Sequence, residues 1–458
     1  MKKQKKFNLC KIISPCQYCK SNDFCKEWVN FIDRHGYPKC YAHFDERKSL
    51  SLPSVRDYVQ DKSKIVSHSF YPFIHFQRKN SRYGKKGRKK SRHLYYCSHL
   101  DRCVYQRYAF LINYQYNVWA KENDMDDVAI AYRDNLGKDN IDFAQFAIDT
   151  IRKTNACFIM VGDFTDFFDG LNHQYLKKML CKLLKQSYLP PDYYAVFKNI
   201  TKFSSWDWKE IVRASGESIT ERGVRKKINQ KRTILTREQF DKNKHYIKRN
   251  DTGVGIPQGS PISAVLANVY MIEFDSFIKK YVEENSGIYM RYSDDFILIF
   301  PEDDVVAIEK HKRFIASYMK TMKGLVELQS EKTHFYIYKN SKILSYPSLE
   351  PSMIDYLGFC FDGEKIKIRP KSVTKYYYRM RRKAKTVGRC NGISSKGKYI
   401  FPRNLYNTYA LNKEKQTFIS YAIKANRKLS LQDAEINSLI KNHKKKIAMA
   451  IKAAKRGK

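Results

Sequence analysis

Two neighbouring aspartates stand where a folded chain could hold metal ions. Asp294 and Asp295 follow Tyr292 and Ser293 and precede the β-forming run 296–300. This pattern is typical of a strand, a tight turn and a second strand, with the acids at the turn. Carboxylates on a rigid turn can bind divalent cations, and a pair of such cations supports displacement at phosphorus. An Asp-Asp pair by itself is more often a solvated turn, so this interpretation depends on other segments.

A third aspartate stands upstream, at the end of an apolar run. Residues 158–162 lead directly into Asp163, which predicts a buried strand that ends in an acid. A bulky aromatic residue, Phe168, follows in the same segment. Two acidic motifs, each at the end of a predicted strand, could supply the ligands of one metal centre.

A segment rich in glycine and proline lies between the two acidic motifs. Residues 255–268 begin Gly-Ile-Pro-Gln-Gly-Ser-Pro and continue with small residues. Glycine and proline predict a turn that brings the backbone close to a ligand, and Ser260 and Pro261 predict the N-cap and first position of the next helix. The three motifs in this order are far more specific than any one of them alone.

In this order the motifs resemble those of prokaryotic reverse transcriptases of the retron, group II intron and defence-associated kinds. The resemblance covers about residues 125–385. A shorter likeness, Ala131-Tyr132-Arg133 with Gly137-Lys138, is closer to defence-associated and abortive-infection members than to intron maturases. The other matching segments are 161–173 (first catalytic motif), 255–268 (PQG motif), 292–295 (YxDD motif), Gly324-Leu325 with Lys332-Thr333 (the motif that follows) and 356–359 (primer-grip hairpin).

The resemblance implies roles for particular residues. Asp163, Asp294 and Asp295 would bind two Mg²⁺ ions, with Asp163 and Asp294 as the more direct ligands and Asp295 as a more peripheral one. Magnesium suits oxygen ligands and keeps room for substrate phosphates. The reaction would be attack of a primer 3′ hydroxyl on the α-phosphate of a deoxynucleotide, with the metals neutralising charge on the pyrophosphate.

Three further residues would contact the nucleotide. Phe168 would lie under the sugar, where a large ring leaves no space for a 2′ hydroxyl; the alternative is a core aromatic, which we favour for Phe167. Gln258 can donate and accept hydrogen bonds near the sugar. Lys332 would approach the triphosphate, and an ordinary surface lysine is the alternative.

Composition agrees with an enzyme of nucleic acids. The 458 residues carry 87 Lys and Arg against 46 Asp and Glu, a formal charge of +41. Such an excess attracts phosphate backbones and releases counterions on binding. No apolar stretch reaches the ~20 residues that cross a bilayer, and the apolar segment after the Lys-rich start is too short for a signal peptide. We expect RNA, DNA product and dNTPs as partners, no membrane, and a cytoplasmic location; the oligomeric state stays open.

The chain is expected to divide into three regions. These are an N-terminal basic extension (1–120), fingers and palm (121–365, with an insertion over 203–250) and a basic helical thumb (366–458). Residues 120–155 look helical, and 436–458 predict a Lys-rich amphipathic helix. The basic run from Arg82 to Arg92 contains Gly84 and Gly87, so it should be mobile and able to follow an RNA backbone.

The eleven cysteines leave a zinc site as a minor alternative. One set combines Cys16 and Cys19 with Cys25, Cys40, His35 and His43, and a second is His93, Cys97, His99 and Cys103, with spacings of helical turns. Either could bind Zn²⁺ tetrahedrally. A CxxC…CxxC pair is absent and buried free cysteines are common, so zinc is the less favoured interpretation. Reduced thiols are expected because no secretion signal precedes them.

Together these observations predict an α+β right-hand polymerase whose palm is an antiparallel sheet backed by helices. The expected activity is RNA-directed DNA synthesis with two Mg²⁺ ions. The absence of a nuclease or RNase H motif favours an enzyme that copies a dedicated non-coding RNA, and the resemblance implies a role in antiphage defence. The alternatives are a group II intron maturase, an untemplated or protein-primed DNA polymerase, and a non-catalytic RNA-binding scaffold. The intact Asp163, Asp294 and Asp295 argue against the scaffold.

Overall fold

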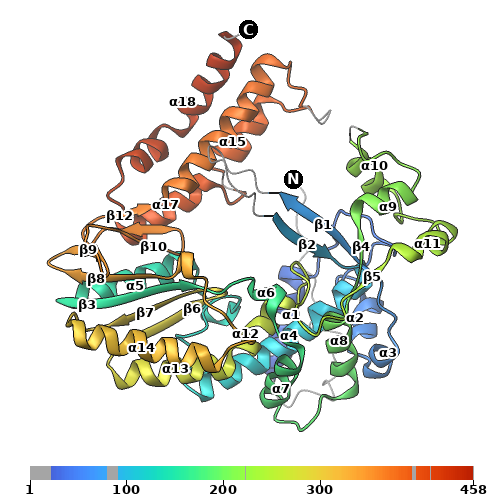
Figure 1. The fold of residues 1–458 in the computed structure, drawn as a ribbon. Coiled ribbons are helices and arrows are strands. Elements are labelled where there is room, and N and C mark those ends of the chain that lie inside the picture. The colour runs from blue at the N-terminus through green and yellow to red at the C-terminus, as the bar shows by residue number, and fades with distance from the viewer. Residues whose placement is uncertain (1–21, 80–90, 222, 395–398, 413, 457–458) are drawn as a thin grey trace. The chain divides into compact units, whose positions relative to one another are not determined.

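The computed structural model describes residues 22–79, 91–221, 223–394, 399–412 and 414–456 (Figure 1). The chain divides into two compact units, and each unit is formed by two separate stretches of sequence. The first unit is Met1–Val118 with Leu171–Tyr270, and the second is Trp119–Gly170 with Met271–Lys458. The predicted RNA-binding run lies outside the described residues from Arg82 to Lys90, and Arg92 lies on strand β2 (Ser91–Tyr96).

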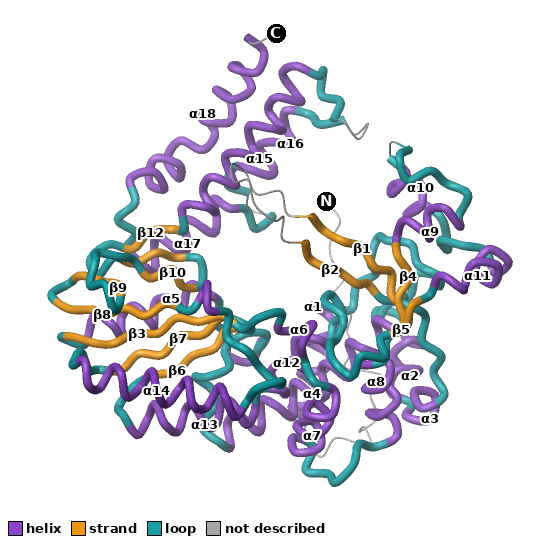
Figure 2. Tube along the Cα trace, in the orientation of Figure 1, coloured by secondary structure: helices purple, strands orange, loops and turns teal. Residues whose placement is uncertain are grey.

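The second unit is built on a five-stranded antiparallel sheet with the strand order β6-β7-β3-β8-β9 (Figure 2). The predicted strand before Asp163 and the predicted hairpin around Asp294 are both present. The sheet confirms the predicted antiparallel α+β architecture. Its strands are β3 (Ala156–Asp163), β6 (Ile288–Tyr292), β7 (Asp295–Phe300), β8 (His334–Lys339) and β9 (Lys342–Ser345).

Helices cover both faces of this sheet because side chains alternate between the faces along each strand. Ile159 joins the core formed with Ile148 and Ile151 of one helix, whereas the neighbouring Phe158 stacks on Phe300 and on His311 of another. Figure 1 shows the helix of residues 140–153 on one side of the sheet and the helices of residues 272–284 and 305–321 on the opposite side. The covering helices are α5 (Asn140–Lys153) on one face and α13 (Ile272–Glu284) and α14 (Val305–Thr321) on the other.

A small sheet and a group of helices complete the second unit. The sheet is antiparallel, in the order β10-β11-β12, and a left-handed pair, Leu357 and Gly358, forms the turn between its first two strands. An apolar stripe on α15 packs against α18, where Gly388 lies so close to Ala454 that an added Cβ would be 2.7 Å away. The elements are β10 (Ile354–Tyr356), β11 (Phe359–Phe361), β12 (Ile366–Ile368), α15 (Pro370–Arg389), α16 (Pro402–Tyr409), α17 (Phe418–Leu429) and α18 (Ala434–Arg456).

The first unit combines helices with a four-stranded mixed sheet in the order β2-β1-β4-β5. The predicted insertion at 203–250 supplies two of these strands and three helices, and Trp206 is fully buried among them. The elements are α1 (Asn22–His35), α2 (Pro53–Gln60), α3 (Lys62–Val66), β1 (Phe73–Lys79), α4 (His99–Glu122, which runs into the second unit), α7 (His173–Leu183), α8 (Pro191–Thr201), β4 (Ser204–Asp207), α9 (Trp208–Ala214), α10 (Val224–Gln230), α11 (Arg237–Asn243), β5 (Lys248–Arg249) and α12 (Ser263–Tyr270).

One predicted helix is interrupted. The expectation of helix throughout 120–155 is wrong, because α4 ends at Glu122 and α5 starts only at Asn140. Helix α5 does not begin earlier because the side chain of Asp139 caps its first turn in a capping box. The loop between the helices instead pairs with strand β6 through a bridge between Ala129 and Arg291. No helix among the described residues is both long and apolar enough to cross a bilayer.

Candidate active site

The three aspartates meet at one end of the five-stranded sheet. Asp163, the last residue of β3, lies directly opposite Asp295, the first residue of β7. The backbone N–H of Phe164 donates to the carbonyl oxygen of Asp294 at 3.2 Å, which fixes the strand end to the hairpin turn. The sequence separates these acids by more than a hundred residues, and the antiparallel register of β3 and β7 brings them together.

The turn that carries Asp294 is held in an unusual backbone conformation. Ser293 has φ +63°, in the left-handed region that side chains other than glycine rarely adopt. Two contacts hold it there: the guanidinium of Arg291 donates to the Ser293 carbonyl at 2.9 Å, and the Tyr132 hydroxyl donates to Ser293 Oγ at 3.2 Å. Tyr132 itself has φ +63°. Strain of this kind persists only where the surroundings over-determine it.

A buried ion pair supports the turn from below. Arg291 and Asp275 are both fully buried, and the guanidinium donates from Nε and Nη2 to the two carboxylate oxygens at 2.8 and 2.6 Å. The Tyr289 hydroxyl donates to the same carboxylate at 2.7 Å. A buried pair of charges is tolerated only when its hydrogen bonds are made, as they are here. Sequence reasoning missed this pair, although an arginine inside an apolar strand was a usable signal.

Negative charge accumulates at the strand ends. The pKa of Asp295 is raised to about 6, first by the protein atoms that crowd one side of its carboxyl group and then by the charges of Asp294 and Asp163. The other side of the carboxyl group stays open to solvent. Carboxylates that oppose each other's ionisation suit divalent cations, and oxygen is the ligand that Mg²⁺ prefers. The donor set therefore fits magnesium, although no three such side chains among the described residues already form a closed ligand cluster.

A lysine side chain lies beside Asp163, the most buried of the three aspartates. The ammonium group of Lys332 pairs with the carboxylate of Asp163, a residue that is 5 % exposed, and its positive charge opposes part of the rise in the pKa of Asp295. The backbone N–H of Gln329 donates to the Asp163 carbonyl at 2.8 Å, so the segment before Lys332 runs along the strand end. The predicted motif at 324–333 thus borders the aspartates, which sequence spacing alone could not show.

Comparison with known protein families identifies the family of the chain. The family model described as reverse transcriptase (RNA-dependent DNA polymerase) matches residues 83–361, more than half of the chain. The chain belongs to the reverse transcriptase family. The match contains β3, the PQG segment and the hairpin of Asp294 and Asp295. No curated protein sequence matches the chain.

Several solved telomerase structures are similar to this reverse transcriptase chain. The apo telomerase of Candida tropicalis, truncated from its C-terminal domain, is 12% identical with a TM-score of 0.41 over 70% of this chain and 61% of the telomerase. The apo telomerase of the same organism has a TM-score of 0.37 over 78% and 63% at 12% identity. The Candida albicans telomerase, in complex with the TWJ fragment of telomeric RNA, has 0.39 over 93% and 72%, also at 12% identity. The chain spans about three fifths of the length of the first two.

The paired phenylalanines of the reverse transcriptase chain differ in burial as predicted. Phe167 is buried and stacks on Phe164, while Phe168 is half-buried and meets the edge of Phe167. Both lie on the short helix α6 (Phe167–Gly170), directly after the loop that leaves β3. Phe168 thus belongs to the same unit as Asp163, with part of its ring accessible.

Gln258 is the one predicted site residue outside this unit. It lies in the first unit, where the main-chain carbonyl oxygen of Gln258 accepts a hydrogen bond from the backbone N–H of Tyr95 at 2.9 Å. The next residue, Gly259, has φ +115°, and an added Cβ would lie 2.4 Å from the Tyr95 carbonyl oxygen. The turn therefore brings the backbone close to strand β2, whereas the sequence predicted an approach to a ligand.

The predicted helix cap after this turn is wrong. Helix α12 begins at Ser263, and Ser263 Oγ donates to the Pro257 carbonyl at 2.7 Å. Ser260 Oγ is buried with no partner among the described residues. The turn that packs Gly259 against β2 extends through Ile262, so the helix starts later than the Ser-Pro pair predicted.

The cysteine and histidine sets considered above as an alternative zinc site form no cluster among the residues that the structure describes. His93 lies on a strand rather than at helical spacing, and its ring bonds to His75 at 2.9 Å. His99 begins α4 and donates to the Tyr41 carbonyl at 3.0 Å. No group of three metal-binding side chains occurs in the described ranges, and Cys16 and Cys19 of the other set lie outside them.

Proposed function

We propose that this chain is an RNA-directed DNA polymerase that transfers nucleotides with two Mg²⁺ ions. The observation that carries the proposal is the meeting of Asp163, Asp294 and Asp295 at one end of the sheet, where burial and then the neighbouring negative charges raise the pKa of Asp295 to about 6. Membership of the reverse transcriptase family supports the same chemistry. The five-stranded sheet then serves as the palm, and helices α15 to α18 serve as the thumb.

Each residue has a separate task in this proposal. Asp163 and Asp294 hold the metal ions, and Asp295 keeps the site negative. When bound, Mg²⁺ lowers the pKa of the primer hydroxyl and neutralises charge on the pyrophosphate. Lys332, which pairs with Asp163 in this structure, would approach the triphosphate, and Gln258 would bond near the sugar. The exposed part of the Phe168 ring excludes a 2′ hydroxyl by contact.

We further propose that the template is a dedicated non-coding RNA and that the enzyme acts in the bacterial cytoplasm against phage. The formal charge of +41 supports a nucleic-acid partner. The defence role rests on the resemblance of Ala131-Tyr132-Arg133 with Gly137-Lys138, and of the catalytic motifs, to retron-like and defence-associated enzymes. The PQG and YxDD motifs are shared with intron maturases, so the template decides between them.

Primer extension tests the chemistry. The full chain, given an RNA template, a DNA primer, dNTPs and Mg²⁺, should extend the primer, and Asp294→Asn should reduce kcat by about 10³-fold because a metal ligand is lost. Asp303→Asn is the matched control, since Asp303 is a carboxylate in the loop that follows the far end of β7 and pairs with Lys339 at 2.6 Å. Equal activity of the two variants would overturn the proposed site.

Sequencing of bound nucleic acid tests the template. The protein is purified with its RNA, supplied with dNTPs, and both the RNA and the new DNA are sequenced. One recurrent RNA with complementary DNA supports the proposal. DNA without any complementary RNA would instead support untemplated synthesis, and enrichment of intron RNA would support a maturase.

A further inference from the structure

The loop that follows α4 runs along the palm sheet towards the turn at Ser293. The backbone N–H of Arg291 donates to the Val128 carbonyl at 2.7 Å, and the Arg291 carbonyl accepts from the Ile130 N–H at 3.0 Å. This pairing with strand β6 is parallel. Residues 123–133, the supporting loop, thus extend the sheet by one short segment, and the loop ends beside the turn that carries Asp294.

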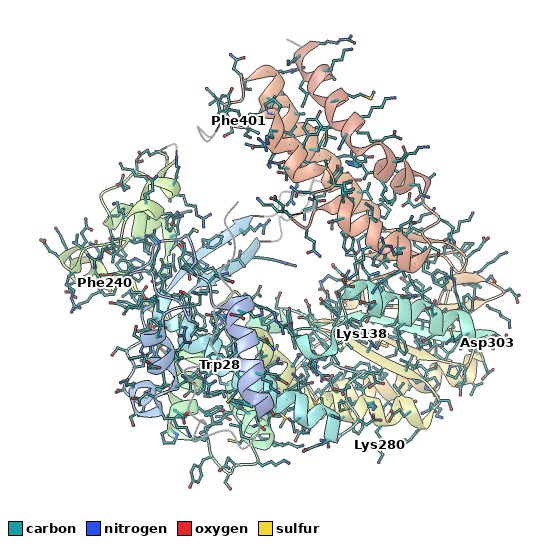
Figure 3. The ribbon with its side chains drawn as sticks, turned by 180° about the vertical axis from the view of Figure 1, so that it is seen from behind. Trp28, Lys138, Phe240, Lys280, Asp303 and Phe401 are labelled. Carbon is teal, nitrogen blue, oxygen red and sulfur yellow. The ribbon has the colours of Figure 1, made fainter. Side chains whose placement is uncertain are left out.

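Charged contacts fix the supporting loop at its start and at its end. At the start, the ammonium group of Lys279 on α13, a residue that is 6 % exposed, lies 3.1 Å from the carboxylate of Asp124. At the end, the fully buried guanidinium of Arg133 pairs with Asp126. Figure 3 shows this region from behind, with Lys138 labelled where the chain passes on to α5. The loop is therefore anchored by contacts that do not involve the turn at Ser293.

Tyr132 of the loop and Ser293 of the turn share an unusual backbone conformation. Each has φ +63°. Glycine adopts this conformation readily, whereas a residue with a Cβ needs surrounding contacts that hold it there. The Tyr132 hydroxyl donates to Ser293 Oγ at 3.2 Å, and the Ser293 side chain is buried, away from water as an alternative partner. One hydrogen bond thus joins two strained residues that are 161 positions apart in the sequence.

The conformation of Ser293 sets the direction of the next residue, Asp294. The φ and ψ angles are the only soft torsions of each residue, so a change of φ at Ser293 would turn the peptide that follows. That peptide carries the Asp294 carbonyl, which accepts from the Phe164 N–H at 3.2 Å at the end of β3. Tyr132 can therefore influence the aspartate through Ser293, although its hydroxyl bonds to the serine and not to the carboxylate.

We propose that Tyr132 is a positioning residue for Asp294. Its hydroxyl holds Ser293 in the left-handed conformation, and this keeps the Asp294 carboxylate in the place where it acts together with Asp163. The anchored loop supplies the fixed point from which the hydroxyl acts. The inference rests on the proposed function of the aspartates for its effect on catalysis, whereas the bond between Tyr132 and Ser293 is measurable in the metal-free chain.

Three substitutions in the full chain separate the hydrogen bond from the backbone strain. Tyr132→Phe removes the donor, Ser293→Ala removes the acceptor, and Ser293→Gly removes the strain because glycine needs no contact to keep φ positive. Tyr132→Phe and Ser293→Ala should each lower kcat of primer extension by about 3- to 10-fold, as loss of one hydrogen bond predicts, with KM for dNTP unchanged. The double variant Tyr132→Phe/Ser293→Ala should lose no more, since both changes remove the same bond.

The decisive comparison uses the glycine variant. In Ser293→Gly, the further change Tyr132→Phe should alter kcat by less than about twofold, because the turn no longer depends on the hydroxyl. Tyr246→Phe is the matched control: it removes a hydroxyl from a tyrosine of the first unit that is 42 % exposed, close to the 45 % of Tyr132, and should leave kcat unchanged.

Urea unfolding of the same variants in EDTA gives a measurement that needs no catalysis. Tyr132→Phe should lower the unfolding midpoint of the parent and leave that of Ser293→Gly unchanged. Additive losses in the Tyr132→Phe/Ser293→Ala variant, or an equal effect of Tyr132→Phe in the parent and in Ser293→Gly, would overturn the proposal. An inactive parent whose variants still show the expected midpoints would count against the proposed function and would support the bond between the two residues.

Discussion

The hairpin turn at Ser293 and the C-terminal helices α15 and α18 differ in where their charged side chains lie. Beneath the turn, Arg291 and Asp275 are fully buried and bonded to each other. On the helices, cations such as Lys444 and Lys445 are exposed, and the buried side of α15 is apolar. A metal site needs its ligands held to within a fraction of an ångström, whereas attraction of a phosphate backbone needs only charge of the correct sign.

This difference predicts how each region responds to substitution. Loss of one group under the turn leaves its partner buried and unsatisfied, so the cost is large and local. Loss of one surface cation leaves many others, so the cost is small and adds up with the number removed. Four experiments test this difference, in order of decreasing expected effect.

The largest effect is expected from Arg291→Met. The substitution leaves the Asp275 carboxylate buried without its partner and should lower the free energy of unfolding by about 3–5 kcal/mol, with loss of polymerase activity. Urea unfolding of the variant and parent measures this difference. The double variant Arg291→Met/Asp275→Leu removes both charges and should recover part of the stability. A single variant as stable as the parent would show that the turn does not depend on the ion pair.

The next effect concerns nucleotide choice. Phe168→Ala removes the half-exposed ring next to the buried Phe167 and should raise the rNTP to dNTP ratio of kcat/KM by about 10- to 100-fold. RNA affinity should not change, because no charge is lost. Phe167→Leu serves as the control, since it should reduce stability without changing the ratio. An unchanged ratio in active Phe168→Ala protein would assign the sugar gate to another residue.

A smaller effect is expected on the helical side. Lys444→Ala/Lys445→Ala should weaken RNA binding by about tenfold at low salt and reduce the slope of log K against log salt by about 2, with little change in kcat. The matched control removes Lys280 and Arg313, which are exposed on α13 and α14. Filter binding over a range of salt concentrations compares the two. Identical slopes would mean that α18 does not contact RNA.

The smallest effect is a gain of stability at the active site. The pKa of Asp295 is raised from 3.8 to about 6 in the folded chain, so the folded state holds this proton more tightly and the free energy of unfolding falls as pH rises from about 4 to about 6. Asp295→Asn should therefore stabilise the metal-free chain by about 1 kcal/mol at pH 7, because the exposed side of the carboxyl group limits the penalty.

The gain from Asp295→Asn should vanish at pH 4, where the parent carboxyl group is protonated in the folded chain. Thermal unfolding in EDTA at both values of pH measures it. An equal gain in Tm at pH 4 and pH 7 would show that the stabilisation does not come from removal of the Asp295 charge. Added Mg²⁺ should raise the Tm of the parent more than that of the variant, because only binding to the folded state stabilises.

Local patterns predicted the elements, and long-range packing decided their partners. The strand that ends at Asp163, the hairpin at Asp294 and the helix after Ile368 are present as predicted. The helix cap at Ser260 and the continuous helix over 120–155 were wrong. Both errors occur where a segment bonds to a distant strand, β2 in one place and β6 in the other, and such bonds leave no periodic signal in the sequence.

The chemistry predicted for the site follows from residue types and their order: the carboxylates, the aromatic residue after Asp163 and the excess of cations. Tertiary structure alone decided that Lys332 pairs with Asp163, that Arg291 is neutralised by Asp275, and that Tyr132 bonds to Ser293. These pairings join segments far apart along the chain. Their free energy depends on burial and distance, which only the folded backbone sets.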